Sequence, residues 1–141
     1  MTPDSGEAYS VRPIGRVASP LVDPATAPKQ GREGSPEASI VFDAAIAVGV
    51  RDIRPGDHCI VLTWLHRAAR DVLAVHPRDD PANPERGVFS TRSADRPNPI
   101  GLHRVVVEAV EGLELRVRDL EAIDGTPVLD VKLVLDGPGD A

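Results

Sequence analysis

Short segments that alternate between apolar and charged residues restrict the fold of this chain more than any other feature. In LELRVRD, at 113–119, leucine and valine fill positions 113, 115 and 117, and glutamate and arginine fill positions 114, 116 and 118. Successive side chains of a β-strand point to opposite faces, so this pattern predicts a strand with one buried face. The β-branched segment 104–110 precedes it, and Glu111-Gly112 between the two predicts a tight hairpin.

Further short strands are expected along the chain, separated by turns rich in proline, glycine and aspartate. They are 10–19, 38–43, 59–65, 71–76 and 128–135. The first contains Pro13 and Gly15 and is expected at an edge, whereas the continuous apolar run 59–65 suits a strand buried on both faces.

The pattern at 128–135 predicts one inward-facing row of side chains, made of Leu129, Val131, Leu133 and Leu135. The run 44–50 fits either a strand or a short helix. Many short strands with little amphipathic helix predict a mainly antiparallel β domain, either a barrel or a sandwich.

Length, charge and cysteine content narrow the class of protein. The 141 residues fit one domain, expected at 11–136 between short tails at 1–10 and 137–141. A net charge of -6 opposes binding of phosphate over the whole surface, so any contact with nucleic acid has to be local. Cys59 has no second cysteine to pair with and is expected to be a buried thiol. No signal peptide or membrane-spanning run is present, which predicts a cytoplasmic protein without a membrane partner.

Several widely used catalytic and cofactor motifs are absent from the sequence. It contains no GxGxxG, P-loop or GxSxG motif, so a Rossmann fold is not expected. The histidines lack HExxH spacing and the single cysteine cannot form a paired zinc site, so no metal is expected. His76 and His103 are expected to have ordinary structural roles.

The segment GVFSTRSADRPNPIGL, at 87–102, is unusually stiff and locally basic. Pro97 and Pro99 fix the backbone, and Gly101 allows close approach of another group. Arg92 and Arg96 each offer a planar fork for a carboxylate or phosphate. The residues alone leave two interpretations open, a rigid connector or a loop ordered in advance to bind a ligand.

This segment closely resembles the signature of the TrmO family, also called TsaA-like or YaeB-like. Four more motifs resemble the family in the same order: IGRVASP at 14–20, PKQ at 28–30, DHCIVLTWLH at 57–66 and DGTPVLDVK at 124–132. The resemblance covers most of residues 11–135. It implies a small antiparallel β-barrel unrelated to the Rossmann fold.

The resemblance also implies an activity and a cofactor. Members of the family are S-adenosylmethionine-dependent methyltransferases that bind the cofactor at a homodimer interface. The best-known activity methylates N6 of threonylcarbamoyladenosine at position 37 of tRNA. By this resemblance the cofactor-binding residues are Gln30, His66, Arg92, Leu102, Asp124, Gly125, Thr126 and Pro127.

Roles at the acceptor follow from the same resemblance and from the chemistry of methyl transfer. N6 carries a proton that has to leave, and His66 or Asp124 is expected to accept it. Arg96, Asn98 and Lys132 are the expected substrate-binding residues.

Two alternatives to a tRNA methyltransferase remain open, because several acidic residues lie near the expected site. Asp95 stands inside the signature segment, and the lead-in HPRDDPANP at 76–84 is also acidic. Acidic groups there would oppose an RNA backbone. The chain is therefore either a tRNA methyltransferase, a methyltransferase for a small molecule, or a non-catalytic regulatory domain that binds S-adenosylmethionine. The extra C-terminal domain of many bacterial members is not expected here.

Overall fold

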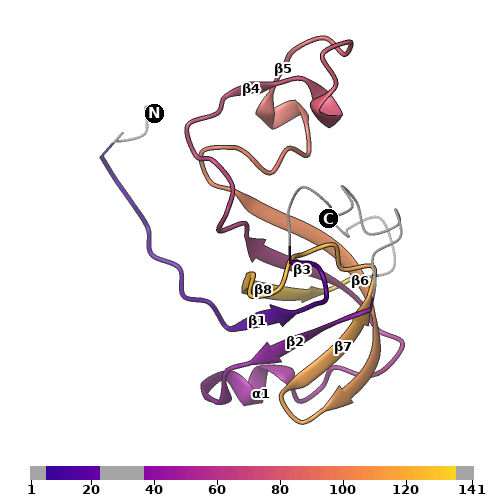
Figure 1. The fold of residues 1–141 in the computed structure, drawn as a ribbon. Coiled ribbons are helices and arrows are strands. Elements are labelled where there is room, and N and C mark those ends of the chain that lie inside the picture. The colour runs from indigo at the N-terminus through magenta and orange to yellow at the C-terminus, as the bar shows by residue number, and fades with distance from the viewer. Residues whose placement is uncertain (1–5, 23–36, 136–141) are drawn as a thin grey trace.

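Six antiparallel strands close into a barrel in this computed structural model, which describes residues 6–22 and 37–135. In order around the barrel they are β1 (Gly15–Ala18), β2 (Ala38–Phe42), β7 (Glu114–Arg118), β6 (Ile100–Glu111), β3 (His58–Trp64) and β8 (Pro127–Leu133) (Figure 1). Pairing of β8 with β1 closes the circle. The expected mainly β fold is confirmed, and of the two architectures left open it is the barrel.

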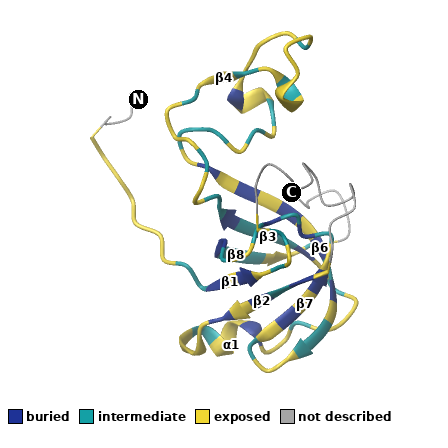
Figure 2. Cartoon of the chain, in the orientation of Figure 1, coloured by how far each residue is buried: buried dark blue, intermediate teal, exposed yellow. Residues whose placement is uncertain are grey.

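Apolar side chains from one face of each strand fill the interior of the barrel. Val17, Ile40, Val61, Leu115 and Val128, from five different strands, are at most 2% exposed. The buried positions follow the strands of the barrel in Figure 2. The predicted hairpin is also present, because β6 and β7 pair up to the turn that contains Gly112.

Two of the expected strands have different surroundings from those predicted. β1 is not an edge strand, because it pairs with β2 on one side and β8 on the other, and a closed barrel has no edges. β3 is not buried on both faces. Its inward residues are buried, but Ile60, Leu62 and Trp64 lie half-buried on the outer surface.

The inward-facing row predicted at 128–135 is wrong in part. Val128 and Val131 line the interior, but Leu129 is an extra residue at a bulge, where the pairing of β8 with β3 shifts register. The strand ends at Leu133, which is 56% exposed, and Leu135 beyond it is 59% exposed. A bulge moves the side-chain alternation by one residue, so a pattern of period two cannot predict it.

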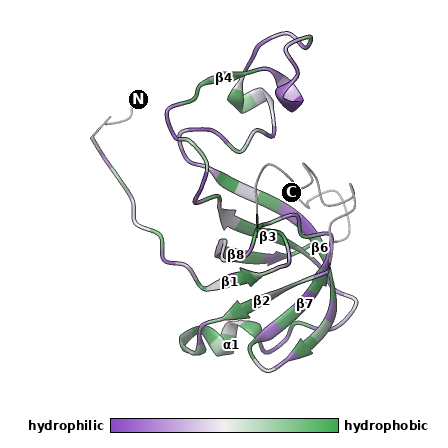
Figure 3. Cartoon of the chain, viewed as in Figure 1, coloured by the Kyte–Doolittle hydropathy of each residue, from purple (hydrophilic) through white to green (hydrophobic). Residues whose placement is uncertain are grey.

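Residues 66–99 form a lobe at one end of the barrel, between β3 and β6 (Figure 1). The lobe contains β4 (Ala74–Val75), β5 (Arg86–Gly87) and two short 3-10 segments, η3 (Pro77–Asp79) and η4 (Val88–Ser90). The strand expected at 71–76 is thus reduced to β4. Much of the lobe is hydrophilic (Figure 3).

The ambiguous run 44–50 is helical. It comprises η2 (Ala44–Ile46) and α1 (Ala47–Val50), which follow β2 at the end of the barrel opposite the lobe. Within the described residues, no helix has the length and apolar content needed to cross a bilayer.

Candidate functional site

Three chain segments meet at the end of the barrel where β1 and β3 finish and β8 begins. The amide of Asp124 donates to the carbonyl of Leu21 at 2.6 Å, and that of Gly125 donates to Val17 at 2.7 Å. The guanidinium of Arg67 donates to the carbonyl of Val22 at 3.1 Å. The predicted residues His66 and Asp124–Pro127 therefore come from neighbouring segments.

The turn at Asp124–Pro127 is held rigidly against β1. Its conformation requires glycine at position 125, where φ is 83°. The buried Thr126 hydroxyl donates to the carbonyl of Ile123 at 2.7 Å, which closes the turn from inside. The peptide amide of Ser19 donates to one carboxylate oxygen of Asp124 at 3.0 Å. Within residues 6–22 and 37–135 the second oxygen of this carboxylate has no partner, so it is open to a ligand.

His66, the other residue expected to accept a proton, is exposed just beyond β3. Among the described residues it has no hydrogen-bond or ion-pair partner, and no hydrogen bond joins it to Asp124. Both side chains are accessible to a substrate from solvent, and neither is committed to a buried network.

The two arginines of the signature segment have different surroundings. Arg96 donates to three backbone carbonyls of its own loop, Ser93 at 2.7 Å, Val88 at 2.8 Å and Thr91 at 2.9 Å. Charged donors make strong hydrogen bonds, so Arg96 shapes the segment 88–96. Arg92 is exposed and has no partner in the described part of the chain. Its guanidinium is therefore available to an anion.

Contacts with residues 69–70 hold the signature loop against the segment that follows β3. Asp95 accepts a hydrogen bond from the amide of Ala69 at 2.8 Å. Arg70 donates to the carbonyl of Pro97 at 2.8 Å and to the side-chain oxygen of Asn98 at 3.2 Å. The Arg70 guanidinium also lies 5.1 Å from the ring centroid of Trp64. Sequence reasoning missed Arg70, because no spacing rule links it to a loop 27 residues away.

The remaining predicted residues lie on the outer surface of the barrel. Leu102 on β6 pairs with Leu62 on β3 and is 48% exposed. Lys132 on β8 is exposed and lies 3.2 Å from the carboxylate of Asp130. Lys132 is five residues along the strand from Pro127, or about 17 Å, so the structure does not bring it to the turn. Gln30 lies outside the described residues.

Leu102 belongs to an apolar patch on the outside of the barrel, the β3–β6 outer face. This face consists of Ile60, Leu62, Trp64, Ile100 and Leu102. Ile100 and Leu102 are 46% and 48% exposed. A contiguous apolar patch of this kind marks an interaction surface more often than isolated apolar residues do.

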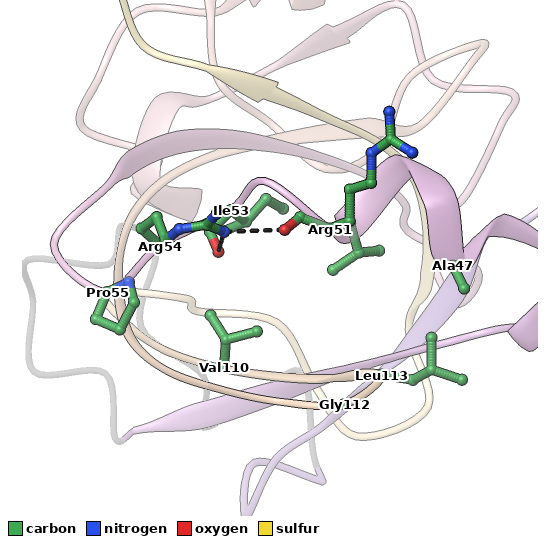
Figure 4. A pocket seen from close by; sticks show the side chains of 9 residues that line it. Ala47, Arg51, Ile53, Arg54, Pro55, Val110, Gly112 and Leu113 are labelled. Atoms are coloured by element: carbon green, nitrogen blue, oxygen red, sulfur yellow. Dashed lines mark hydrogen bonds between the residues drawn. The ribbon is translucent and has the colours of Figure 1, made fainter.

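A shallow hollow lies at the opposite end of the barrel (Figure 4). It lies between α1, the turn at 51–55 and the β6–β7 hairpin, and is lined by Ala47, Val50, Arg51, Ile53, Arg54, Pro55, Val110, Gly112 and Leu113. A second hollow, around His58 and Arg104, also lacks every predicted site residue. The better candidate site is the end of the barrel with the exposed polar groups, where residues 67–70 contact both the signature loop and Val22 beside the Asp124 turn.

Two buried polar features lie inside the barrel. Burial, and secondly the carboxylate of Asp57, raise the pKa of the Cys59 thiol, so this cysteine is kept neutral. His103, for which the sequence indicated no special role, is hydrogen-bonded to Thr63 and Glu121. The described residues contain no group of three or more side chains able to hold a metal ion.

Comparisons with known proteins identify the relatives of the chain. The model of the tRNA-methyltransferase O N-terminal domain matches residues 16–136. An S-adenosyl-L-methionine-binding protein of Archaeoglobus fulgidus is 45% identical over 86% of both chains. A probable S-adenosyl-L-methionine-binding protein of Methanothermobacter thermautotrophicus is 46% identical over 86% of this chain and 87% of its own.

Solved structures have the same fold. Two crystal structures of TrmO from Pseudomonas aeruginosa align over 96% of this chain, with TM-scores of 0.72 and 0.69 and identities of 27% and 25%. The alignment covers 60% and 61% of those proteins. The present chain therefore spans less than two thirds of their length.

Proposed function

Because the chain belongs to the tRNA-methyltransferase O N-terminal domain family, we propose that it is an S-adenosyl-L-methionine-dependent methyltransferase whose acceptor is N6 of threonylcarbamoyladenosine at position 37 of tRNA. The family match over residues 16–136 carries this proposal. S-adenosyl-L-methionine is the cofactor, as in the relatives named for binding it.

The polar groups at the candidate site suit this cofactor. S-adenosyl-L-methionine supplies an electrophilic methyl group and carries a carboxylate, an ammonium group and an adenine. Arg92, which has no partner among the residues that the structure describes, is a cation for the carboxylate, and the second oxygen of Asp124 suits the ammonium group or a ribose hydroxyl. Leu102 offers apolar surface to the adenine ring. Gln30 and the backbone of Gly125–Pro127 complete the proposed cofactor-binding set.

Alignment and proton removal are the tasks left to the protein. A loop ordered before binding holds the acceptor near the methyl group, and such alignment is worth up to about 7 to 11 kcal/mol. His66 or Asp124 accepts the proton that leaves N6. Arg96, Asn98 and Lys132 are the proposed contacts to the acceptor. Arg96 also donates within its own loop and Asn98 accepts from Arg70, whereas Lys132 lies away from the Asp124 turn and would have to contact a part of the acceptor distant from that turn.

A homodimer is part of the proposal, because the site is open in a single chain. The β3–β6 outer face adjoins the signature loop and contains Leu102. A second copy of the chain packed on this apolar face would cover both the leucine and the cofactor beside it. This accounts for large apolar residues on the outside of a barrel whose interior is already filled.

Methyl transfer to defined RNAs tests the proposal. The purified protein is incubated with S-adenosyl-L-methionine labelled in its methyl group and with tRNA that carries or lacks the threonylcarbamoyl group. Mass spectrometry of the nucleosides should show methyl added to the modified adenosine alone. Transfer to both RNAs, or to neither, contradicts the proposed acceptor.

Two observations favour alternatives that the same assay distinguishes. The net charge of -6 favours a small-molecule acceptor over RNA. In that case the labelled methyl group would appear on a metabolite when a cell extract is supplied, and not on tRNA. The two archaeal relatives are named for binding S-adenosyl-L-methionine, and a regulatory domain would share that property. Tight binding of the cofactor without transfer to any acceptor would support that alternative.

A further inference from the structure

Three polar side chains form a continuous hydrogen-bonded chain inside the barrel. Nδ1 of His103 lies 2.6 Å from a carboxylate oxygen of Glu121, and Nε2 lies 2.7 Å from the hydroxyl of Thr63. Thr63 is 0% exposed and His103 4% exposed. Buried polar groups are costly unless satisfied, so a complete network of this kind orients the elements it joins.

This arrangement resembles a hydroxyl–imidazole–carboxylate catalytic triad, but its burial excludes that role. The Thr63 hydroxyl cannot reach a substrate, because the side chain is fully enclosed in the barrel. A carboxylate oxygen can only accept, so the hydrogen in the bond to Glu121 belongs to Nδ1 of His103. The imidazole therefore has a fixed orientation and links its two neighbours.

The network joins the three segments that carry the proposed site. Thr63 lies on β3, three residues before His66. His103 lies on β6 and directly follows Leu102. Glu121 belongs to the irregular segment between β7 and β8, three residues before Asp124. Its neighbours Leu120 and Ala122 are buried by apolar contacts, which have no preferred direction. The hydrogen bond from His103 to Glu121 depends on direction and therefore fixes the orientation of this segment.

We infer that Thr63, His103 and Glu121 are positioning residues, which set the Asp124–Pro127 turn in its place relative to β3 and β6. That the turn binds S-adenosyl-L-methionine rests on the proposed function, whereas its positioning by these three residues does not. When Glu121 loses its hydrogen bond to His103, the turn loses its fixed approach to β1. The amides of Asp124 and Gly125, which now bond to Leu21 and Val17, then open more often.

Amide hydrogen exchange on the full chain measures this opening directly. The variants are Glu121→Ala, which removes the acceptor, and Glu121→Gln, which keeps an accepting oxygen. The matched control is Val107→Ala, because Val107 is buried on the same strand as His103 but lies toward the opposite end of the barrel. Binding of S-adenosyl-L-methionine to the same proteins is measured by calorimetry.

In Glu121→Ala, exchange of the Asp124 and Gly125 amides should rise about tenfold relative to the control, and Glu121→Gln should restore most of the protection. Cofactor affinity should fall about tenfold in Glu121→Ala and remain unchanged in Val107→Ala, even though both lower the melting temperature. The inference is overturned if these amides exchange alike in Glu121→Ala and Val107→Ala. If the turn loosens as expected but the wild type binds no S-adenosyl-L-methionine, positioning is supported and the proposed function fails.

Discussion

Replacing Gly101 by alanine tests whether the signature motif needs a glycine for the buried network. A Cβ at this position would overlap the Thr63 hydroxyl and lie 2.7 Å from Nε2 of His103, with Leu65 only 3.1 Å away. The Thr63 hydroxyl and the His103 ring are buried and hydrogen-bonded to each other at 2.7 Å, so neither can move away without disturbing that bond. The glycine is thus required by space rather than by backbone conformation.

The cost of Gly101→Ala can be estimated from these contacts. Overpacking a well-filled interior costs roughly 1 to 3 kcal/mol, and disturbing buried hydrogen bonds costs about 1 to 3 kcal/mol more. We expect the free energy of unfolding to fall by about 2 to 6 kcal/mol, and the melting temperature by roughly 7 to 20 °C for a chain of this size. Thermal and urea denaturation, followed by circular dichroism, measure both quantities.

Gly49→Ala is the matched control for this substitution. Gly49 lies in α1, and no heavy atom lies within 4 Å of a Cβ placed there. Alanine is favoured over glycine inside a helix by roughly 0.5 to 1 kcal/mol, so this variant should keep or slightly raise the melting temperature. Combining Gly101→Ala with Thr63→Ala should recover more than about 0.5 kcal/mol by removing one overlap. A Gly101→Ala protein as stable as Gly49→Ala would refute the argument.

Three further predictions follow from single groups. Arg96→Ala should lower the melting temperature by several degrees and expose the lobe to protease, whereas Arg92→Ala should melt like the wild type but bind S-adenosyl-L-methionine at least about tenfold more weakly by calorimetry. Ile100→Asp should disrupt the proposed dimer, as measured by light scattering, and Val41→Asp, an equally exposed position on β2, should not. Burial raises the pKa of Cys59 in the folded protein, so the unfolded chain loses the thiol proton first as the pH rises. The free energy of unfolding should therefore fall above about pH 8.5, and Cys59→Ala should abolish that fall.

Local patterns predicted the elements of the barrel but not how the strands meet. The alternation at 113–119 and the Glu111-Gly112 turn depend on neighbouring residues, and both features are confirmed. Burial of β3 on both faces was wrong, because a run such as CIVLTWL is compatible with an apolar outer surface as well as with two buried faces. The bulge at Leu129 depends on pairing with β3, which no single segment encodes.

The candidate site, too, was predicted in part: its motifs were found from the sequence, but the contacts that hold them were not. The signature segment and the Asp124 turn were found from their motifs, and the segments next to them along the chain lie at one end of the barrel. The partners that hold them were not found. Arg70 and Asn98 are 28 residues apart and His103 and Glu121 are 18 residues apart, so their roles arise from tertiary contacts rather than from local spacing.

These contacts separate two kinds of residue within the signature segment. Arg96 bonds to its own backbone, Gly101 makes room for Thr63 and His103, and Asp95 holds the amide of Ala69. Arg92 alone among these four has no partner within the described residues, so it is the one whose loss should spare folding. One carboxylate oxygen of Asp95 bonds to the Ala69 amide, so Asp95 has a structural role besides any electrostatic effect on an incoming RNA. The strength of the RNA proposal therefore depends on whether acidic groups elsewhere in the lobe, such as Glu85, oppose the phosphates, and the salt dependence of tRNA binding measures that opposition.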